Sequence, residues 1–195
     1  NVLQIYSNWK RNCQVLIKMI GSRKKRIGIF GGSFDPPHVG HLGISKLAIK
    51  KLSLDEIYWC VTKKNPHKNK AFFSLPERIK KSKVITNKIK KIKIKFFENK
   101  LKSNNTIDLV KYLKKKHEKN IFFLIIGSDN LIKFHKWKNW KLLPKLIEII
   151  VFSRKDYDKK AKKSVTMKEV KKIVFIKNEP INISSTHIRK KYYKA

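Results

Sequence analysis

Strand-like and helix-like hydrophobic patterns alternate along this chain, and this alternation constrains the fold more than any other feature. Short apolar runs bounded by polar residues or glycine are typical of buried strands, and apolar positions three or four apart are typical of amphipathic helices. The patterns predict strands over residues 26–30, 56–61, 92–96, 121–126, 146–152 and 171–176. They predict helices over residues 40–51, 75–88, 106–116 and 185–193. This alternation favours an α/β fold in which a mostly parallel sheet carries helices on both faces.

The length of 195 residues fits one domain, which we expect to span residues 19–195. We expect residues 1–18 to lie outside it, either as an unstructured extension or as residues upstream of a natural start at Met19. A short docked helix is the alternative for that segment. Inside the domain, residues 156–172 have the weakest pattern, and we expect a mobile surface connection there.

The net charge of +36 comes almost entirely from lysine, because 43 of the 49 basic residues are Lys and 6 are Arg. A surface that grips phosphates in a planar, bidentate way would use more arginine. The lysines are spread along the whole chain beside many Ile, Asn and Phe residues, all of which have AT-rich codons. We therefore interpret the charge mainly as compositional drift and expect no dedicated nucleic-acid partner, with nucleic-acid binding as the alternative.

Cysteine content and hydropathy exclude secreted and membrane-spanning classes. Cys13 and Cys60 are too few for a disulfide framework, so we expect a reduced, cytoplasmic protein. The longest apolar run, residues 121–126, is far shorter than the roughly 20 residues that cross a membrane. The apolar residues 15–17 are interrupted by Lys18 and make a poor signal-peptide core.

The strongest local motif is Gly-Gly-Ser-Phe-Asp-Pro-Pro-His-Val-Gly-His, residues 31–41, between the first strand and the first helix. We expect Gly31 and Gly32 to let the backbone turn tightly and approach a ligand. His38 and His41 share a helix face, and a helix start favours anions. The segment is neither a Walker loop nor a Gly-x-Gly-x-x-Gly fingerprint, and no nearby Cys or Glu completes a zinc site. These features predict a clamp for a triphosphate and its transition state.

A second motif, Ile-Ser-Ser-Thr-His-Ile-Arg at residues 183–189, lies far downstream. Its Ser and Thr hydroxyls can cap a helix or donate to phosphate oxygens, and Arg189 can fork onto a phosphate. An ordinary capped helix is the alternative. Together with the first motif, the segment is expected to form the second wall of one anion site.

These two motifs resemble the signature motifs of the adenylyltransferases of the nucleotidyltransferase superfamily. The residues between them resemble the bacterial nicotinate-nucleotide adenylyltransferases, whose Pro-His-Lys loop, Thr-x-Asp helix start and Gly-x-Asp-x-Leu…Trp-x-x-Trp block match residues 65–68, 106–108 and 127–140. Ser153 and Arg154 after a strand also fit. One departure is Leu109-Val110, where the family usually has Thr-Leu. The resemblance runs in order from about residue 26 to residue 190.

The resemblance implies a Rossmann-like, doubly wound fold and adenylyl transfer from ATP to nicotinate mononucleotide, giving nicotinate adenine dinucleotide and pyrophosphate. It implies Mg²⁺ carried by the ATP phosphates and no metal site made of protein ligands alone. The ATP-binding residues would be Gly31, Gly32, Ser33, Phe34, His38, His41, Gly127, Asp129, Ile183, Ser184, Ser185, Thr186 and Arg189. The catalytic residues would be His38, His41 and Arg189, and the substrate-binding residues Lys68, Thr106 and Trp137.

Several alternatives stay open at the level of sequence. The acceptor could be nicotinamide mononucleotide or phosphopantetheine, and a basic RNA-binding protein on the same scaffold belongs to a different class. We expect Trp140 to be a core residue and Asp108 to make a favourable contact with a helix dipole. The oligomeric state cannot be predicted.

Overall fold

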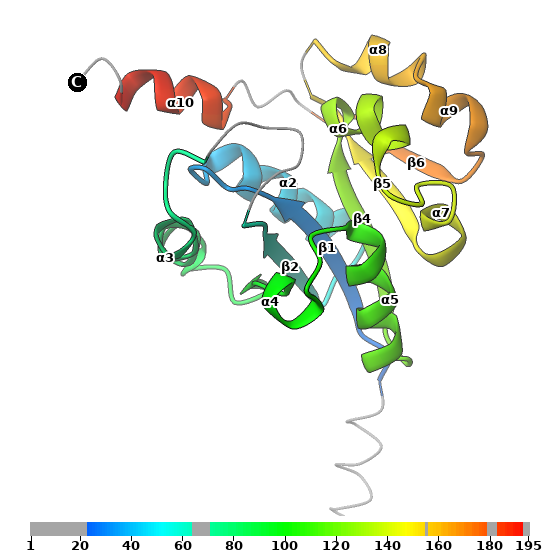
Figure 1. Cartoon of the computed structure of the whole chain (residues 1–195), viewed down its shortest axis with the longest axis horizontal. Helices are drawn as coiled ribbons and strands as arrows, with labels where there is room; N and C mark the ends of the chain where they lie inside the picture. The colour runs from blue at the N-terminus through cyan, green and yellow to red at the C-terminus, as the bar shows by residue number, and fades with distance from the viewer. Residues whose placement is uncertain (1–22, 64–70, 155, 179–182, 193–195) are drawn as a thin grey trace, which may run out of the picture.

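The computed structural model describes residues 23–63, 71–154, 156–178 and 183–192, and the six strands in these ranges form one sheet (Figure 1). The strands are β1 (Arg26–Gly32), β2 (Glu56–Val61), β3 (Ile92–Lys95), β4 (Ile121–Gly127), β5 (Glu148–Phe152) and β6 (Ile173–Ile176). Every neighbouring pair is parallel, in the order β3-β2-β1-β4-β5-β6. The expected doubly wound parallel sheet is confirmed. The strand order reverses between β1 and β4, where sheets of this kind bind ligands beyond the carboxyl ends of their strands.

The longer helices begin and end close to the positions that the hydrophobic pattern predicts. They are α2 (Val39–Lys51), α3 (Leu75–Thr86), α5 (Thr106–Lys116) and α10 (Ser185–Tyr192). The shorter ones are α4 (Glu98–Leu101), α6 (Ser128–Lys133), the 3₁₀ turn η1 (Phe134–Lys136), α7 (Leu143–Leu146), α8 (Asp158–Lys162) and α9 (Val165–Glu169). Six or fewer residues make at most two turns, which is too few for a helical period to stand out from the sequence.

The expectation of a mobile connection over residues 156–172 was wrong, because this segment folds into α8 and α9. Ala161 and Thr166 are fully buried against the core, and the Ser164 hydroxyl accepts a hydrogen bond from the backbone of Met167 at the start of α9. The lysines between these positions face solvent and conceal the few residues that anchor the segment. A smaller correction concerns residues 146–152, where α7 ends at Leu146 and β5 begins only at Glu148.

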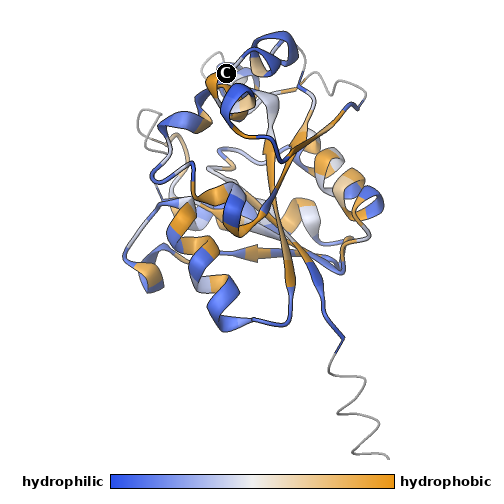
Figure 2. Cartoon of the chain, turned by 90° about the vertical axis from the view of Figure 1, so that its right-hand side faces the viewer, coloured by the Kyte–Doolittle hydropathy of each residue, from blue (hydrophilic) through white to orange (hydrophobic). Residues whose placement is uncertain are grey.

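The sheet separates two apolar clusters, one on each face. Helices α5 to α9 cover the first cluster, and α2 and α3 cover the second. Alternate residues of β4 serve the two faces: Phe122 and Leu124 point into the first cluster, and Phe123 and Ile125 into the second. Figure 2 shows the resulting pattern of apolar strands and of helices that carry both hydrophobic and hydrophilic residues.

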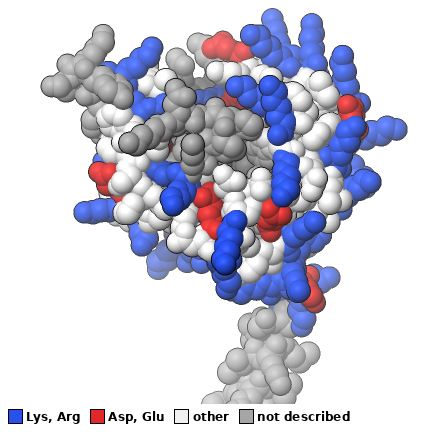
Figure 3. Space-filling model, in the orientation of Figure 1, with Lys and Arg blue, Asp and Glu red and all other residues white. Residues whose placement is uncertain are grey.

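Basic side chains are spread over the whole face of the molecule that Figure 3 shows and do not gather in one patch. This distribution agrees with the lysine pattern of the sequence. In the part of the chain that the structure describes, every helix is too short or too polar to pass through a bilayer.

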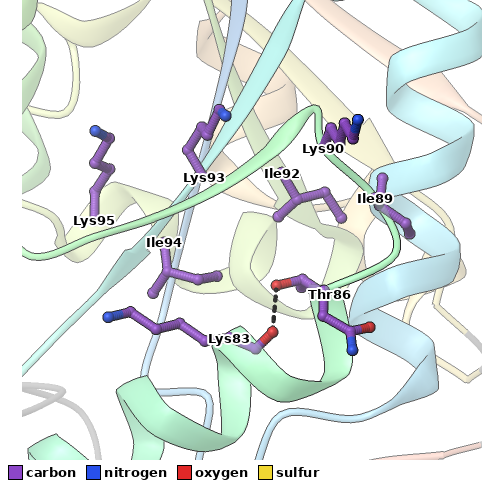
Figure 4. Close-up of a pocket in the computed structure, with 9 residues that line it drawn as sticks. Lys83, Thr86, Ile89, Lys90, Ile92, Lys93, Ile94 and Lys95 are labelled. Carbon is purple, nitrogen blue, oxygen red and sulfur yellow. Dashed lines mark hydrogen bonds between the residues drawn. The ribbon is translucent and has the colours of Figure 1, made fainter.

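A pocket of about 380 Å³ lies between α3 and the edge strand β3 (Figure 4). Ile92 and Ile94 point toward α3, while Lys93 and Lys95 point to the opposite side of the strand. This alternation confirms the strand with one wet face that the period-two pattern predicts. None of the predicted site residues lines this pocket, so the candidate site must be sought at the carboxyl ends of the central strands.

Candidate functional site

The two histidines of the upstream motif form the N-terminal cap of α2. The Nδ1 atom of His38 accepts the backbone N–H of Gly40 at 3.1 Å, and Nδ1 of His41 accepts the backbone N–H of His38 at 3.2 Å. Ser, Thr, Asp and Asn usually fill such a capping role. A ring nitrogen that accepts an N–H carries no proton, so each neutral ring holds its proton on Nε2. Both histidines are therefore fixed as Nε2–H donors.

The two imidazoles lie close together, with ring centroids 3.9 Å apart. Gly40 makes this packing possible, because a Cβ at that position would lie 2.9 Å from two atoms of the His38 ring. Any other residue at position 40 would push the ring away from the helix start. The Gly in the His-Val-Gly-His sequence is thus required by the placement of His38.

His38 is electrically neutral at neutral pH. Burial, and then the positive charge of Arg154, lower its pKa from 6.5 to about 4. With only 8% of its surface exposed, the ring can donate a hydrogen bond to an anion without bringing a buried charge of its own.

The turn between β1 and α2 is made differently from what we expected. Gly31 and Gly32 belong to β1 and neither has a positive φ, so the prediction that they form a tight turn was wrong. The left-handed residue is Phe34, with φ 47°. Its ring is 1% exposed and stacks on Trp59 with centroids 4.6 Å apart and planes within 8°. Core packing therefore offsets the strain, and any nucleotide contact at Phe34 would come from its backbone.

The downstream motif lies against the upstream one, as predicted. The Ser185 hydroxyl donates to the Pro36 carbonyl at 2.9 Å, and Nη1 of Arg189 donates to the Asp35 carbonyl. The side chain of Ile183 approaches Gly40 so closely that a Cβ there would lie 3.1 Å from it. Arg189 also donates to the Thr186 hydroxyl at 3.1 Å. The fork of Arg189 onto a phosphate stays a prediction, because in this structure the guanidinium binds Asp35 and Thr186.

The carboxyl ends of β4 and β5 contribute an acidic and a basic side chain. Asp129 lies in the first turn of α6, and its Oδ2 accepts Nη1 of Arg154 at 2.6 Å. Gly127 leaves room for this carboxylate, since a Cβ there would lie 2.5 Å from Oδ1 of Asp129. The Ser128 hydroxyl accepts the backbone N–H of Arg154 at 3.0 Å and fixes the approach of the two strands' ends.

The residues expected to bind the second substrate lie on the α5 side of the sheet. Thr106 is the first residue of α5, and Trp137 follows η1 with its ring 4.9 Å from that of Phe134. Asp108 accepts the Ser103 hydroxyl at 2.6 Å, and this hydrogen bond is the main reason why its pKa is lowered. Trp140 packs against the first apolar cluster, as expected. Lys68 lies outside the described residues.

The residues predicted for the site did not include three that organise this region: Asp35, which lies within the upstream motif, Arg154, which was noted only as fitting the family pattern, and Arg78. Asp35 and Arg78 are 5% and 1% exposed. A usable signal was the scarcity of arginine in a chain of 49 basic residues. Where lysine is the default, an arginine is expected only where its planar fork makes several hydrogen bonds.

The side chains at this end of the sheet suit phosphate better than a bare metal ion. No cluster of three or more His, Cys, Asp or Glu residues occurs within the described ranges. Both carboxylates near the histidines face arginines: Asp129 pairs with Arg154, and Asp35 lies 3.7 Å from Arg189. The remaining groups are hydroxyls, neutral imidazoles and guanidinium groups, all of which donate hydrogen bonds to phosphate oxygens.

Comparisons with known proteins identify relatives of similar sequence and fold. A profile described as cytidylyltransferase-like matches residues 29–191. A Pelagibacter ubique protein named "Probable nicotinate-nucleotide adenylyltransferase" is 49% identical over 88% of this chain and 96% of its own length. A Ruegeria protein of the same name is 37% identical over 66% of this chain and 67% of its own. The solved Plasmodium falciparum nicotinic acid mononucleotide adenylyltransferase, complexed with NaAD, is 25% identical, with a TM-score of 0.67 over 85% of this chain and 83% of its own.

Proposed function

The chain belongs to the nicotinate-nucleotide adenylyltransferases, within the cytidylyltransferase-like family, and on that premise we propose that it transfers the adenylyl group of ATP to nicotinate mononucleotide. The products are nicotinate adenine dinucleotide and pyrophosphate, so the reaction is a step of NAD biosynthesis. A phosphate oxygen of the mononucleotide attacks the α-phosphorus of ATP. The bond from that phosphorus to the α–β bridging oxygen breaks, and pyrophosphate leaves with the bond's electrons. The attacking group belongs to the substrate, so the protein needs no nucleophile.

The protein's task in this reaction is to align two anions that repel each other and to stabilise the charge that develops between them. We assign this task to His38 and His41, whose Nε2–H groups are fixed as donors by the cap at the start of α2. His41, the more exposed of the two, would lie nearest the transferring phosphorus. Ser184, Ser185, Thr186 and Arg189 on the opposite wall would hold the β- and γ-phosphates.

Mg²⁺ would enter bound to ATP and neutralise charge on the phosphate oxygens. Gly127 and Asp129 would lie against the adenosine ribose, with Asp129 oriented by Arg154. The resemblance to the family suggests these roles, and the positions of the residues at the carboxyl ends of β1 and β4, where the strand order reverses, support them.

The observation that best supports this proposal is the pair of Nε2-donating histidines, together with the docking of α10 onto the loop residues Asp35 and Pro36 just before them. Neither segment alone encloses a triphosphate. Together they place hydrogen-bond donors on two sides of the same space, from residues about 150 positions apart in the sequence.

We further propose that the second substrate is the acid and not the amide. The first backbone N–H groups of α5 have no acceptor within the helix, and the helix dipole favours an anion there. Asp108 is the nearby carboxylate that could accept a hydrogen bond from an amide NH₂, but it already accepts hydrogen bonds from Ser103 and Asn105. A site built around one polar group rejects a substrate that lacks it, so we expect a preference for nicotinate mononucleotide of at least about a hundredfold in kcat/KM.

One assay tests both parts of the proposal. Pyrophosphate release from MgATP is measured at physiological salt with nicotinate mononucleotide, nicotinamide mononucleotide or phosphopantetheine as the acceptor. We expect turnover with the nicotinate compound at an efficiency about a hundredfold above that with the amide. Equal efficiencies would contradict acid selectivity, whereas activity only with phosphopantetheine would contradict the assignment of the acceptor. We also propose a reducing cytoplasm as the compartment of the protein, because two cysteines are too few for a disulfide framework.

A further inference from the structure

Arg78, on the first turn of α3, is an arginine buried among backbone carbonyls. Its guanidinium donates to four of them: Ser33 at 2.6 Å, Thr62 at 2.7 Å, Lys63 at 3.0 Å and Phe73 at 3.1 Å. These carbonyls come from three separate segments: the β1–α2 loop (residues 33–37), the two residues that follow β2, and the residues that precede α3. A side chain that is 1% exposed and has four protein acceptors cannot be a direct ligand of the substrates.

Asp35, in the β1–α2 loop, binds the same segment before α3 that Arg78 binds. Its carboxylate accepts the backbone N–H groups of Phe72 and Phe73 at 2.8 and 2.9 Å. The peptide backbone at Phe73 therefore donates to Asp35 and accepts from Arg78. Two buried charged residues, one from the β1–α2 loop and one from α3, clamp the same short segment.

The β1–α2 loop is consequently fixed at successive residues just before the histidines. Arg78 binds the carbonyl of Ser33, Trp59 stacks on Phe34, and the backbone of residues 72 and 73 binds Asp35. His38, which caps α2, comes directly after Pro36 and Pro37. A shift of the loop at Ser33 would move both imidazoles relative to the opposite wall.

Lysine could not replace this arginine. Its ammonium is a single point of charge with three donors, whereas the guanidinium spreads five N–H groups over a plane and reaches acceptors on several sides. The charge itself is balanced locally. Burial lowers the pKa of Arg78, and the carboxylates of Asp35 and Glu98 oppose that shift.

We infer that Arg78 is a positioning residue for adenylyl transfer, which fixes the β1–α2 loop and thereby aims His38 and His41 at the reacting phosphates. The inference rests on the proposed function, because it assigns the histidines their task. Loss of this positioning should lower kcat without a matching loss of substrate affinity. Misaligned donors destabilise the transition state more than they destabilise the bound substrates.

The test compares Arg78→Lys with Ile79→Ala. Ile79 is the next residue of α3, partly buried against the second apolar cluster, and its truncation weakens the helix without touching the four carbonyls. We expect Arg78→Lys to lower kcat about tenfold or more at 15 °C, with a much smaller change in KM for ATP. Ile79→Ala should lower Tm and leave the kcat of the folded protein within about twofold of wild type.

Guanidinium rescue and histidine NMR provide two further tests of the role of Arg78. If Arg78→Lys does not fold, Arg78→Ala supplied with millimolar guanidinium should recover kcat, because the ion can occupy the vacated site. Long-range ¹H–¹⁵N NMR of the free protein should show protonated Nε2 and unprotonated Nδ1 at both histidines. Arg78→Lys, or Arg78→Ala without guanidinium, should disturb this pattern, and Ile79→Ala should preserve it.

The outcomes separate this inference from the proposed function. Wild-type kcat and unchanged histidine signals in Arg78→Lys would overturn the positioning role, as would an equal loss of kcat in Ile79→Ala. A wild-type protein that makes no dinucleotide would refute the proposed function, and the histidine spectra would still decide whether Arg78 orients the rings.

Discussion

The two walls of the candidate phosphate site are built in different ways. The β1–α2 loop is attached to the core, through the stacking of Phe34 on Trp59 and the hydrogen bonds of Arg78 and Asp35. The start of α10 is attached mainly to that loop, through Ser185 and Arg189, and its Thr186 and His187 are exposed. The loop is organised by the sheet, and α10 is organised by the loop.

This difference predicts that substitutions in the loop and substitutions in α10 have unequal effects on the opposite wall. A change in the loop should disturb both walls, because α10 loses the carbonyls and the carboxylate on which it docks. A change in α10 should leave the loop in place, because the loop's anchors lie in β2 and α3 and in the residues before α3. Upstream substitutions should therefore cost more turnover than downstream ones of similar size.

The largest effect is expected from His41→Ala. Loss of one fixed donor to the developing charge should reduce kcat by about 10²-fold or more. Steady-state pyrophosphate release checks this value, and circular dichroism checks the fold. The matched control is His187→Ala on the exposed face of α10, which should stay within about threefold of wild type. Similar losses of kcat in the two variants would contradict the predicted difference between the β1–α2 loop and α10.

The next effect concerns Asp35→Asn, which breaks the loop's contact with both neighbours. The carboxylate accepts the two N–H groups on different oxygens, and in Asn one of these oxygens is replaced by an NH₂ donor with no charge to attract Arg189. We expect kcat to fall about tenfold and unfolding free energy to fall by about 1–3 kcal/mol. Hydrogen exchange should speed up in both residues 72–73 and α10. Faster exchange confined to residues 72–73 would show that α10 docks independently of Asp35.

A smaller effect should follow from Ser185→Ala, which removes one hydrogen bond between α10 and the Pro36 carbonyl. Such a bond contributes about 0.5–1.5 kcal/mol, so amides in α10 should exchange about two- to tenfold faster. The exchange of residues 72–73 should not change. Lys190→Ala, at an exposed position of the same helix, is the control and should alter neither region.

The last prediction concerns the pH dependence of stability. Because burial and Arg154 hold the pKa of His38 near 4, the unfolded chain binds a proton there between about pH 6.5 and 4 that the folded chain does not. Stability from this residue is therefore complete above pH 6.5 and is lost as pH falls toward 4. Asn is a good N-cap and does not titrate, so His38→Asn should lose stability less steeply over this range. Urea midpoints measured from pH 7 to 4 check the slope, and parallel slopes would contradict the buried, neutral assignment.

The strands and long helices were predictable because their burial imposes a period on the sequence. Residues 121–126 read as a continuous apolar run because β4 is buried on both faces, and residues 92–95 alternate because β3 has one wet face. Helices α8 and α9 were missed, because Ala161 and Thr166 are isolated anchors among lysines. Their burial depends on α6, which no local pattern shows.

The site was predictable at the level of motifs and less so at the level of individual roles. The contact between the two motifs was expected, but the turn was assigned to Gly31 and Gly32, whereas Phe34 takes the left-handed conformation. A phenylalanine can do so because Trp59, from another strand, stacks on it. The roles of Arg78 and Asp35 are likewise tertiary, since their partners are backbone atoms of distant segments that carry no sequence signature.

The separation of the two walls along the chain also has a consequence for protein synthesis. Pro36 and Ser185 make a hydrogen bond across 149 positions, and Asp35 and Arg189 across 154. While the ribosome is still translating the segment before residue 185, the emerging chain can already pair β1 with β2 and β4, yet the candidate phosphate site has only one wall. On the proposed assignment of the site, productive binding of the triphosphate therefore requires that β1, β2, β4 and the segment up to residue 189 have all been synthesised.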